Sequence, residues 1–194
     1  MGIGGGSSVD RGTVARPDTS PGSQVLEESE SSSSAKTAAV VTALTTSGII
    51  GRVALQHVPS VEPLIAVAAA TGFYFGTREG IAAGASSYYI SNFLVWGGQG
   101  PWTFFQALGA GAAGASGGLA GQIGEGRNAF LASTIVGVLA YEVVVNVSSF
   151  VFMPSGLSIA FLAASAPFVL THLASTVGFG FMLYGAKDRI GLSG

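Results

Sequence analysis

The stretch NAFLASTIVGVLAYEVVVNVSSFVF, residues 128–152, decides the fold class, because it is almost wholly apolar and contains one charged residue, Glu142. A helix rises about 1.5 Å per residue, and the hydrocarbon core of a bilayer is about 30 Å thick, so about 20 apolar residues can cross it. The stretch therefore predicts a transmembrane helix.

Five further stretches predict membrane-spanning helices, over residues 37–55, 63–76, 80–96, 102–123 and 167–185. The segment 153–166 is apolar but contains Pro154 and Gly156, which interrupt helices, so it is interpreted as a short interfacial or re-entrant segment. The prediction is an all-α integral membrane protein of about six transmembrane helices.

The composition supports this class. Hydrophobic residues make up 48% of the chain and charged residues 9%, whereas a soluble domain has about 25% charged residues. The net charge of −2 and the scattered basic residues argue against nucleic acid as a partner. The chain has no cysteine, which excludes disulfides, thiolate metal ligands and a cysteine nucleophile.

Three regions are predicted: a disordered cytoplasmic tail over 1–35, a six-helix transmembrane domain over 36–187, and a short cytoplasmic tail over 188–194. The first region is rich in Gly, Ser and acidic residues and cannot bury enough apolar area to order itself. It has no apolar run of the kind that a secretory signal needs. The first transmembrane helix is therefore expected to direct insertion into the cell membrane.

Basic residues predict the orientation, because short loops that carry Lys and Arg stay in the cytoplasm. With six spans, one side holds Arg52 alone and the other side holds the remaining basic residues, Arg11, Arg16, Lys36, Arg78, Arg127, Lys187 and Arg189. Both termini are therefore expected to be cytoplasmic. The outward loops are expected at about 56–62, 97–101 and 153–166.

The segment 109–114 fits the dinucleotide-binding pattern G-x-G-x-x-G, but no strand precedes it and no acidic residue follows about 20 positions later. Gly114, Gly117, Gly118 and Gly121 are better interpreted as a small-residue face. Such faces let membrane helices approach closely.

Polar residues in a bilayer are costly and need a partner, a cavity or a task. Those near the expected outward loops, together with two in the fifth helix, are the candidate substrate-binding residues: Arg52, Gln56, Glu62, Asn92, Trp96, Gln99, Trp102, Glu142, Asn146 and His172. Most of these have a structural alternative. Arg52 and Glu62 could form an ion pair, Glu142 could bond another helix or pair with Arg52, His172 could bond another helix, and the tryptophans could anchor the membrane interface. The histidine spacings do not suggest a metal site.

The portions GRVALQ (51–56), PSVEP (59–63) and GGQGPW (97–102) carry a resemblance to a known family. The stretch 51–121, and more loosely the chain to Lys187, resembles the S components of energy-coupling factor transporters, in particular an archaeal-like branch. The resemblance excludes the N-terminal tail. It implies a six-helix subunit that captures a vitamin or related micronutrient at an outward-facing site.

The resemblance also implies partners: a transmembrane coupling protein and two ATP-binding cassette ATPases. Family members often contact the coupling protein through Ala-x-x-x-Ala on the first helix, and Ala39 and Ala43 occupy that place. No cofactor is expected in this chain, because the partner ATPases use the ATP, and the chain is not expected to be an enzyme. Two alternatives stay open: a self-sufficient secondary transporter that uses Glu142, and an intramembrane enzyme that uses Glu142 and His172.

Overall fold

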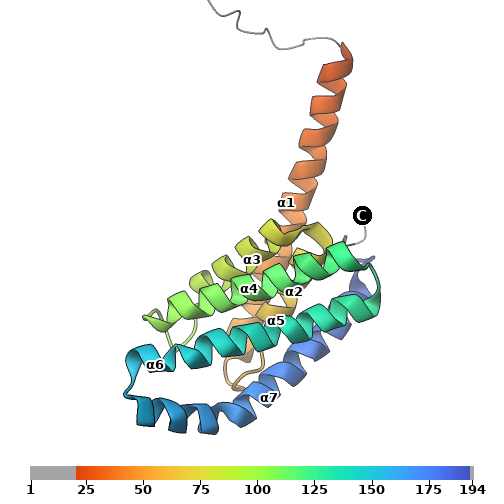
Figure 1. The fold of residues 1–194 in the computed structure, drawn as a ribbon. Coiled ribbons are helices and arrows are strands. Elements are labelled where there is room, and N and C mark those ends of the chain that lie inside the picture. The colour runs from red at the N-terminus through yellow and green to blue at the C-terminus, as the bar shows by residue number, and fades with distance from the viewer. Residues whose placement is uncertain (1–20, 193–194) are drawn as a thin grey trace, which may run out of the picture. The chain divides into compact units, whose positions relative to one another are not determined.

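The computed structural model describes residues 21–192, and over this range it contains helices and no strands (Figure 1). The helices are α1 (Pro21–Leu55), α2 (Leu64–Phe75), α3 (Thr77–Ser91), α4 (Trp102–Ile123), α5 (Arg127–Val147), α6 (Ser149–Phe152) and α7 (Ser155–Ala186). The chain divides into two units, Met1–Ala35 and Lys36–Gly194.

The described part of the first unit, residues 21–35, is helical and forms the beginning of α1. This differs from the disordered tail expected over these residues; the rest of that tail, residues 1–20, lies outside the described range. Helix nucleation is costly, but extending a helix that already exists is not.

Three predicted helices agree with the structure to within a few residues. α2 and α4 match 63–76 and 102–123 closely, whereas α1 ends at Leu55 as expected but begins at Pro21 rather than at 37. Ser148 separates α5 from α6, and together they cover the predicted fifth helix. α3 ends at Ser91 rather than at 96. Gly76 turns the chain between α2 and α3 with φ +117°, which only glycine adopts readily.

The interpretation of 153–166 is wrong. These residues are not an interfacial or re-entrant segment separate from the last helix: after the break at Met153 and Pro154, α7 runs unbroken from Ser155 to Ala186 through Pro167. A proline lacks the N–H that would close one helical turn, but membrane helices tolerate this loss. The C=O of Pro167 still accepts a hydrogen bond from the Thr171 hydroxyl, at 2.9 Å.

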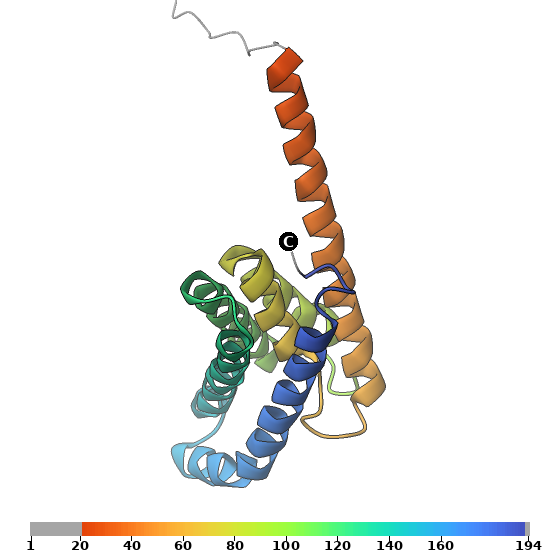
Figure 2. The same cartoon turned by 90° about the vertical axis from the view of Figure 1, so that its right-hand side faces the viewer.

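The centre of the second unit is α2. Every residue from Leu64 to Gly72 is buried, and α2 packs against α3, α4, α5 and α7. In Figure 1, α3, α4 and α5 lie side by side, and Figure 2 shows α5 and α7 joined through α6 at one end. A 12-residue apolar helix that is enclosed on all sides is typical of a buried core helix.

The small-residue face of α4 is confirmed. A Cβ added at Gly117 would lie 2.8 Å from the backbone carbon of Ala69, and one added at Gly121 would lie 2.5 Å from the carbonyl oxygen of Phe73. Real Cβ atoms do not approach backbone this closely. The glycines therefore set the distance between α4 and α2, as expected for helices packed in lipid.

The outer surface is strongly apolar. On α5, Val136, Leu139 and Val143 are exposed, and on α7 so are Leu157, Leu170 and Met182. Within residues 21–192, three helical segments are long and apolar enough to cross a membrane: Glu28–Leu55, Arg127–Phe152 and Ser155–Ala186. Soluble monomers rarely expose apolar patches of this extent. Over its described residues the chain is all-helical, and its long apolar helices and apolar surface indicate a membrane location.

Candidate functional site

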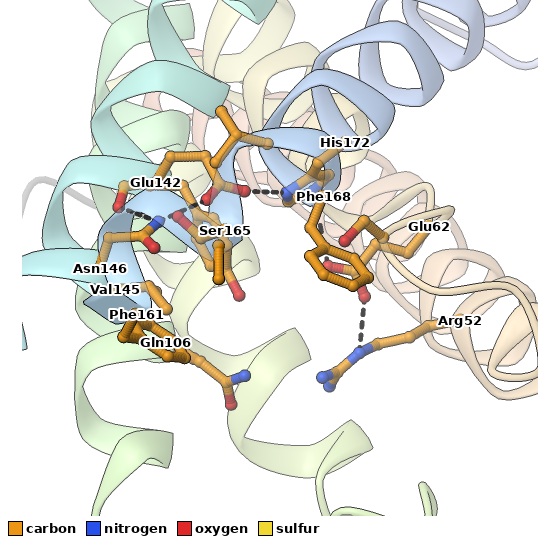
Figure 3. A pocket seen from close by; sticks show the side chains of 14 residues that line it. Arg52, Glu62, Gln106, Glu142, Val145, Asn146, Phe161, Ser165, Phe168 and His172 are labelled. Carbon is orange, nitrogen blue, oxygen red and sulfur yellow. Dashed lines mark hydrogen bonds and ion pairs between the residues drawn. The ribbon is translucent and has the colours of Figure 1, made fainter. Parts of the chain in front are cut away.

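A cavity of about 380 Å³ lies among α4, α5, α7 and the segment that joins α1 to α2 (Figure 3). This volume is in the range of sites for small molecules. The segment after α1 contributes Ser60 and Glu62, α1 contributes Arg52, and α4 contributes Gln106. The remaining lining comes from α5 and α7: Tyr141, Glu142, Val145, Asn146, Phe161, Ala164, Ser165, Phe168, Val169 and His172.

Arg52 and Glu62 form an ion pair, with the Arg52 Nε 2.7 Å from the Glu62 Oε2. Both side chains are largely buried, at 12% and 14% exposure. The Arg52 guanidinium also donates to Ser91 and to Asn92 Oδ1 (2.7 Å) and lies over the Tyr88 ring. The Tyr88 hydroxyl donates to the other oxygen of Glu62. This network links the end of α1 to α3 and holds Glu62 at the cavity.

Glu142 and His172 form the second side-chain contact in the wall of the cavity. The His172 Nδ1 is 2.6 Å from the Glu142 Oε1, and the Asn146 amide donates to the Glu142 Oε2 at 2.8 Å. His172 is 3% exposed, and its Nε2 is 3.6 Å from the Glu62 Oε1. The imidazole therefore lies between two carboxylates that come from different parts of the chain.

Asn92 lies behind the cavity and connects α3 to α4. Its amide accepts from Arg52 and donates to Thr103 Oγ1 (2.9 Å) and Gln106 Oε1 (2.8 Å). Asn92 is buried and does not line the cavity. It acts on the site through Arg52 and Gln106, whose positions it fixes.

A second, smaller cavity of about 220 Å³ contains two more of the predicted residues, Gln56 and Trp96. Arg52, Ser60 and Glu62 line both cavities, so the ion pair forms part of their shared wall. The Gln56 side chain accepts a hydrogen bond from the Trp96 backbone N–H at 3.1 Å.

Gln99 and Trp102 line neither of these two cavities. The Gln99 amide donates to the backbone oxygen of Tyr89 at 2.7 Å. This bond satisfies an exposed carbonyl near the end of α3. The Trp102 ring lies against Gly100 and is 45% exposed. Both residues shape the loop between α3 and α4, which is a structural role.

The structure thus brings five of the ten predicted binding residues to one cavity: Arg52, Glu62, Glu142, Asn146 and His172. Two of the structural alternatives are also confirmed: Arg52 pairs with Glu62, and His172 bonds a residue on another helix. Glu142, however, bonds His172 rather than Arg52.

Several lining residues were not predicted, among them Phe161, Ser165 and Phe168. These residues follow the spacing i, i+4, i+7, and His172 continues the same face at i+11. This spacing is visible in the sequence, but it places the three side chains on one helix face only if residues 153–166 belong to the last helix. Gln106 was recognisable as a polar residue one turn after Trp102.

The arrangement can bind a small molecule by charge and hydrogen bonds inside an apolar protein. Glu62, Glu142 and His172 offer acceptors, and Phe161, Phe168 and Tyr141 offer aromatic surface. Among the described residues, no group of three His, Asp or Glu side chains is placed to hold a metal ion.

Comparison of the chain with protein-family models, curated proteins and solved structures finds no match. The fold and the cavity define the class at a coarser level. Over the residues that the structure describes, the chain is an α-helical protein with three helical segments long and apolar enough to cross a membrane, and with a cavity lined partly by polar and charged side chains.

Proposed function

We propose that this chain is the substrate-capture subunit of an energy-coupling factor importer, which binds a vitamin or related micronutrient for ATP-driven uptake by partner subunits. The observation that carries the proposal is the cavity of about 380 Å³ with Arg52, Glu62, Glu142 and His172 in its wall. Ionisable residues inside a membrane protein are costly and usually mark a pathway or a site for a ligand.

The arrangement of the loops agrees with the proposed six-helix topology with both termini in the cytoplasm, in which the 12-residue α2 is enclosed by the other helices rather than facing lipid. The segments 56–62 and 92–101 meet where Trp96 bonds Gln56. Phe152 lies just before the turn at 153–154, and its ring packs against the ring of Phe105 near the start of α4, with 5.6 Å between the ring centroids. The connections 56–62, 92–101 and 153–154 therefore gather at one end. At the other end of α4, Gln122 donates to Thr77 beside the α2–α3 turn.

Reporter fusions test this topology. Fusions after Gly76 and Glu125 are expected to report cytoplasm, and fusions after Ser60, Gly98 and Gly156 are expected to report the outside. The reason is the retention of basic loops in the cytoplasm. An outside signal after Glu125 would rule out the six-span count.

The first helix offers a surface for the coupling protein. Ala39 and Ala43 are exposed on one face of α1, with Ser47 one turn further along. With Val40, Leu44 and Ile190 they line a shallow groove. A face of small side chains lets a second helix approach closely, which agrees with the place that the resemblance assigns to these two alanines.

Copurification tests the proposed assembly. A tagged chain, extracted from its native membrane in mild detergent, is expected to bring down a coupling protein and two ATP-binding cassette ATPases. Ala39→Leu is expected to lose these partners, because the added side chain occupies the groove. Ala38→Leu is the matched control, since Ala38 is also exposed on α1 but does not line the groove. Equal recovery of the partner subunits with both variants would exclude this face of α1 as the contact with the coupling protein.

One observation favours the secondary transporter as a second candidate. His172 lies between Glu142 and Glu62, and rows of ionisable residues can carry protons in transporters. Uptake by the purified chain alone in proteoliposomes would favour this candidate. Uptake that requires the ATPases would favour the importer.

A further inference from the structure

The hydrogen bonds around Asn92 fix which atoms are donors and which are acceptors. Arginine stays protonated in proteins, carries five N–H donors and accepts no hydrogen bond. The Arg52 Nη1 is 2.7 Å from the Asn92 Oδ1, so this oxygen is the acceptor. The Asn92 Nδ2 is therefore a donor, and it donates to the Gln106 Oε1 at 2.8 Å. The orientation of both amides thus follows from the arginine and requires no assumption about a titrating group.

This orientation leaves two N–H groups free. The Gln106 Nε2 has no hydrogen-bond partner among the described residues, and Gln106 lines the cavity. The Arg52 Nη2 has none either, because the hydrogen bonds of Arg52 run from its Nε to Glu62 and from its Nη1 to α3. Neither nitrogen is one of the fully buried polar atoms without a partner, so both can be reached from the cavity.

The two free donors are neighbours. One amide, that of Asn92, bonds both the Arg52 guanidinium and the Gln106 side chain. In Figure 3 the Gln106 amide and the Arg52 guanidinium point toward each other on the same side of the cavity. A carbonyl or carboxylate oxygen has two lone pairs and can accept from both groups. A group that carries only N–H donors cannot bond either of them.

The carboxylates of the cavity are engaged elsewhere. Both Glu62 oxygens are held within the network that links α1 to α3. Both Glu142 oxygens contact other side chains, one of them His172 and the other Asn146. Among the described residues, neither carboxylate accepts from the free donors. The acceptor for these donors therefore comes from what the cavity holds.

We infer that Arg52 and Gln106 form a subsite for an acceptor, and that the ligand of this cavity presents a carbonyl or carboxylate oxygen to the Nη2 and Nε2 atoms. A site built to bond such an oxygen discriminates against an analogue that lacks it, because the donors are then left unpaired. The inference rests on the proposed function and deepens it, since it names the group by which the substrate is held.

A matched series of flat probes tests the subsite: benzoate (carboxylate), benzamide (neutral carbonyl) and benzamidinium (N–H donors only). Titration calorimetry on the purified full-length protein is expected to show benzoate or benzamide binding roughly tenfold or more tightly than benzamidinium. Benzoate ahead of benzamide would assign a carboxylate, and the reverse order a neutral carbonyl. Benzamidinium that binds as tightly as the better oxygen-bearing probe would overturn the inference, and so would a series in which none binds.

Gln106→Glu locates the subsite. This variant keeps an oxygen for Asn92 and replaces only the free Nε2 donor by a second acceptor. It is expected to weaken binding of the better oxygen-bearing probe by roughly tenfold or more. Gln122→Glu is the matched control, because it makes the same change at an exposed position of α4 and should leave binding unchanged. Wild-type affinity in a folded Gln106→Glu protein would contradict the inference. If this variant does not fold, the series on the wild-type protein still decides the question.

Mass spectrometry of a molecule retained from the native membrane separates this inference from the proposed function. A retained molecule without a carbonyl or carboxylate oxygen would overturn the inference and leave the proposed function in place. The expected order of probes in a chain that copurifies with no coupling protein or ATPase would have the opposite meaning: the subsite would stand and the proposed function would fail.

Discussion

Gly114→Ala is expected to destabilise the protein by about 3 kcal/mol, the upper part of the usual range for overpacking. A Cβ at this position would lie 2.7 Å from the backbone nitrogen of Ile81 and closer still to the carbonyl of Gly80. The obstacle is the backbone of α3, which cannot rotate away as a flexible side chain can. α3 and α4 would have to separate along their length, and the packing of both helices on α2 would be lost.

Thermal unfolding of the detergent-solubilised protein measures this effect, and Gly111→Ala is the matched control. Gly111 is buried on the same helix, but a Cβ there meets its nearest neighbour, Ile81 Cγ2, at 3.6 Å, which is an ordinary contact. Alanine is also the better helix former, by up to about 1 kcal/mol. The control should therefore unfold at the wild-type temperature or above it. Equal melting temperatures for the two variants would contradict the close α3–α4 contact.

The fold was predictable where one local signal dominates. α4 begins after the Gly-Pro cluster 97–101 and ends before Gly124, so that both of its ends are visible in the sequence. α7 was not predictable in the same way, because Pro167 is a helix breaker in water. Membrane helices tolerate proline because neighbouring helices, Ser and Thr side chains or small local adjustments satisfy the freed backbone group, and here the helix continues through Pro167.

The site was predictable in its charges and only partly in its pairings: the Arg52–Glu62 pair was expected as an alternative, whereas the contact of Glu142 with His172 was not. Buried charge is costly, so Arg52, Glu62 and Glu142 stand out in an apolar chain. Which carboxylate pairs with Arg52 depends on how the loop 56–63 folds back, and spacing does not reveal this. The loop is held by a contact across the chain: Ser175 donates to the carbonyl of Ser60 at 3.1 Å. Ser60 itself has φ +59°, which is uncommon for a residue other than glycine.

The Arg52–Glu62 pair leads to the second large expected effect. Arg52→Gln is expected to destabilise the protein by about 3–5 kcal/mol, because it leaves the Glu62 carboxylate buried without a cation. Glu62→Gln is expected to have an effect of similar size, because it leaves the Arg52 guanidinium uncompensated. Arg127→Gln, at an exposed position, is the control for the loss of an arginine and should change stability little.

The double variant Arg52→Gln/Glu62→Gln distinguishes a paired charge from two independent contributions. Neither charge remains buried in this variant, and two amides can bond each other, so it should be more stable than either single variant. The coupling energy from the cycle is expected to be about 2 kcal/mol or more. Full recovery is not expected, because Arg52 also donates to Ser91 and Asn92. If the two single effects simply add, Arg52 is held mainly by α3, and Glu62 is free to serve a ligand without breaking an ion pair.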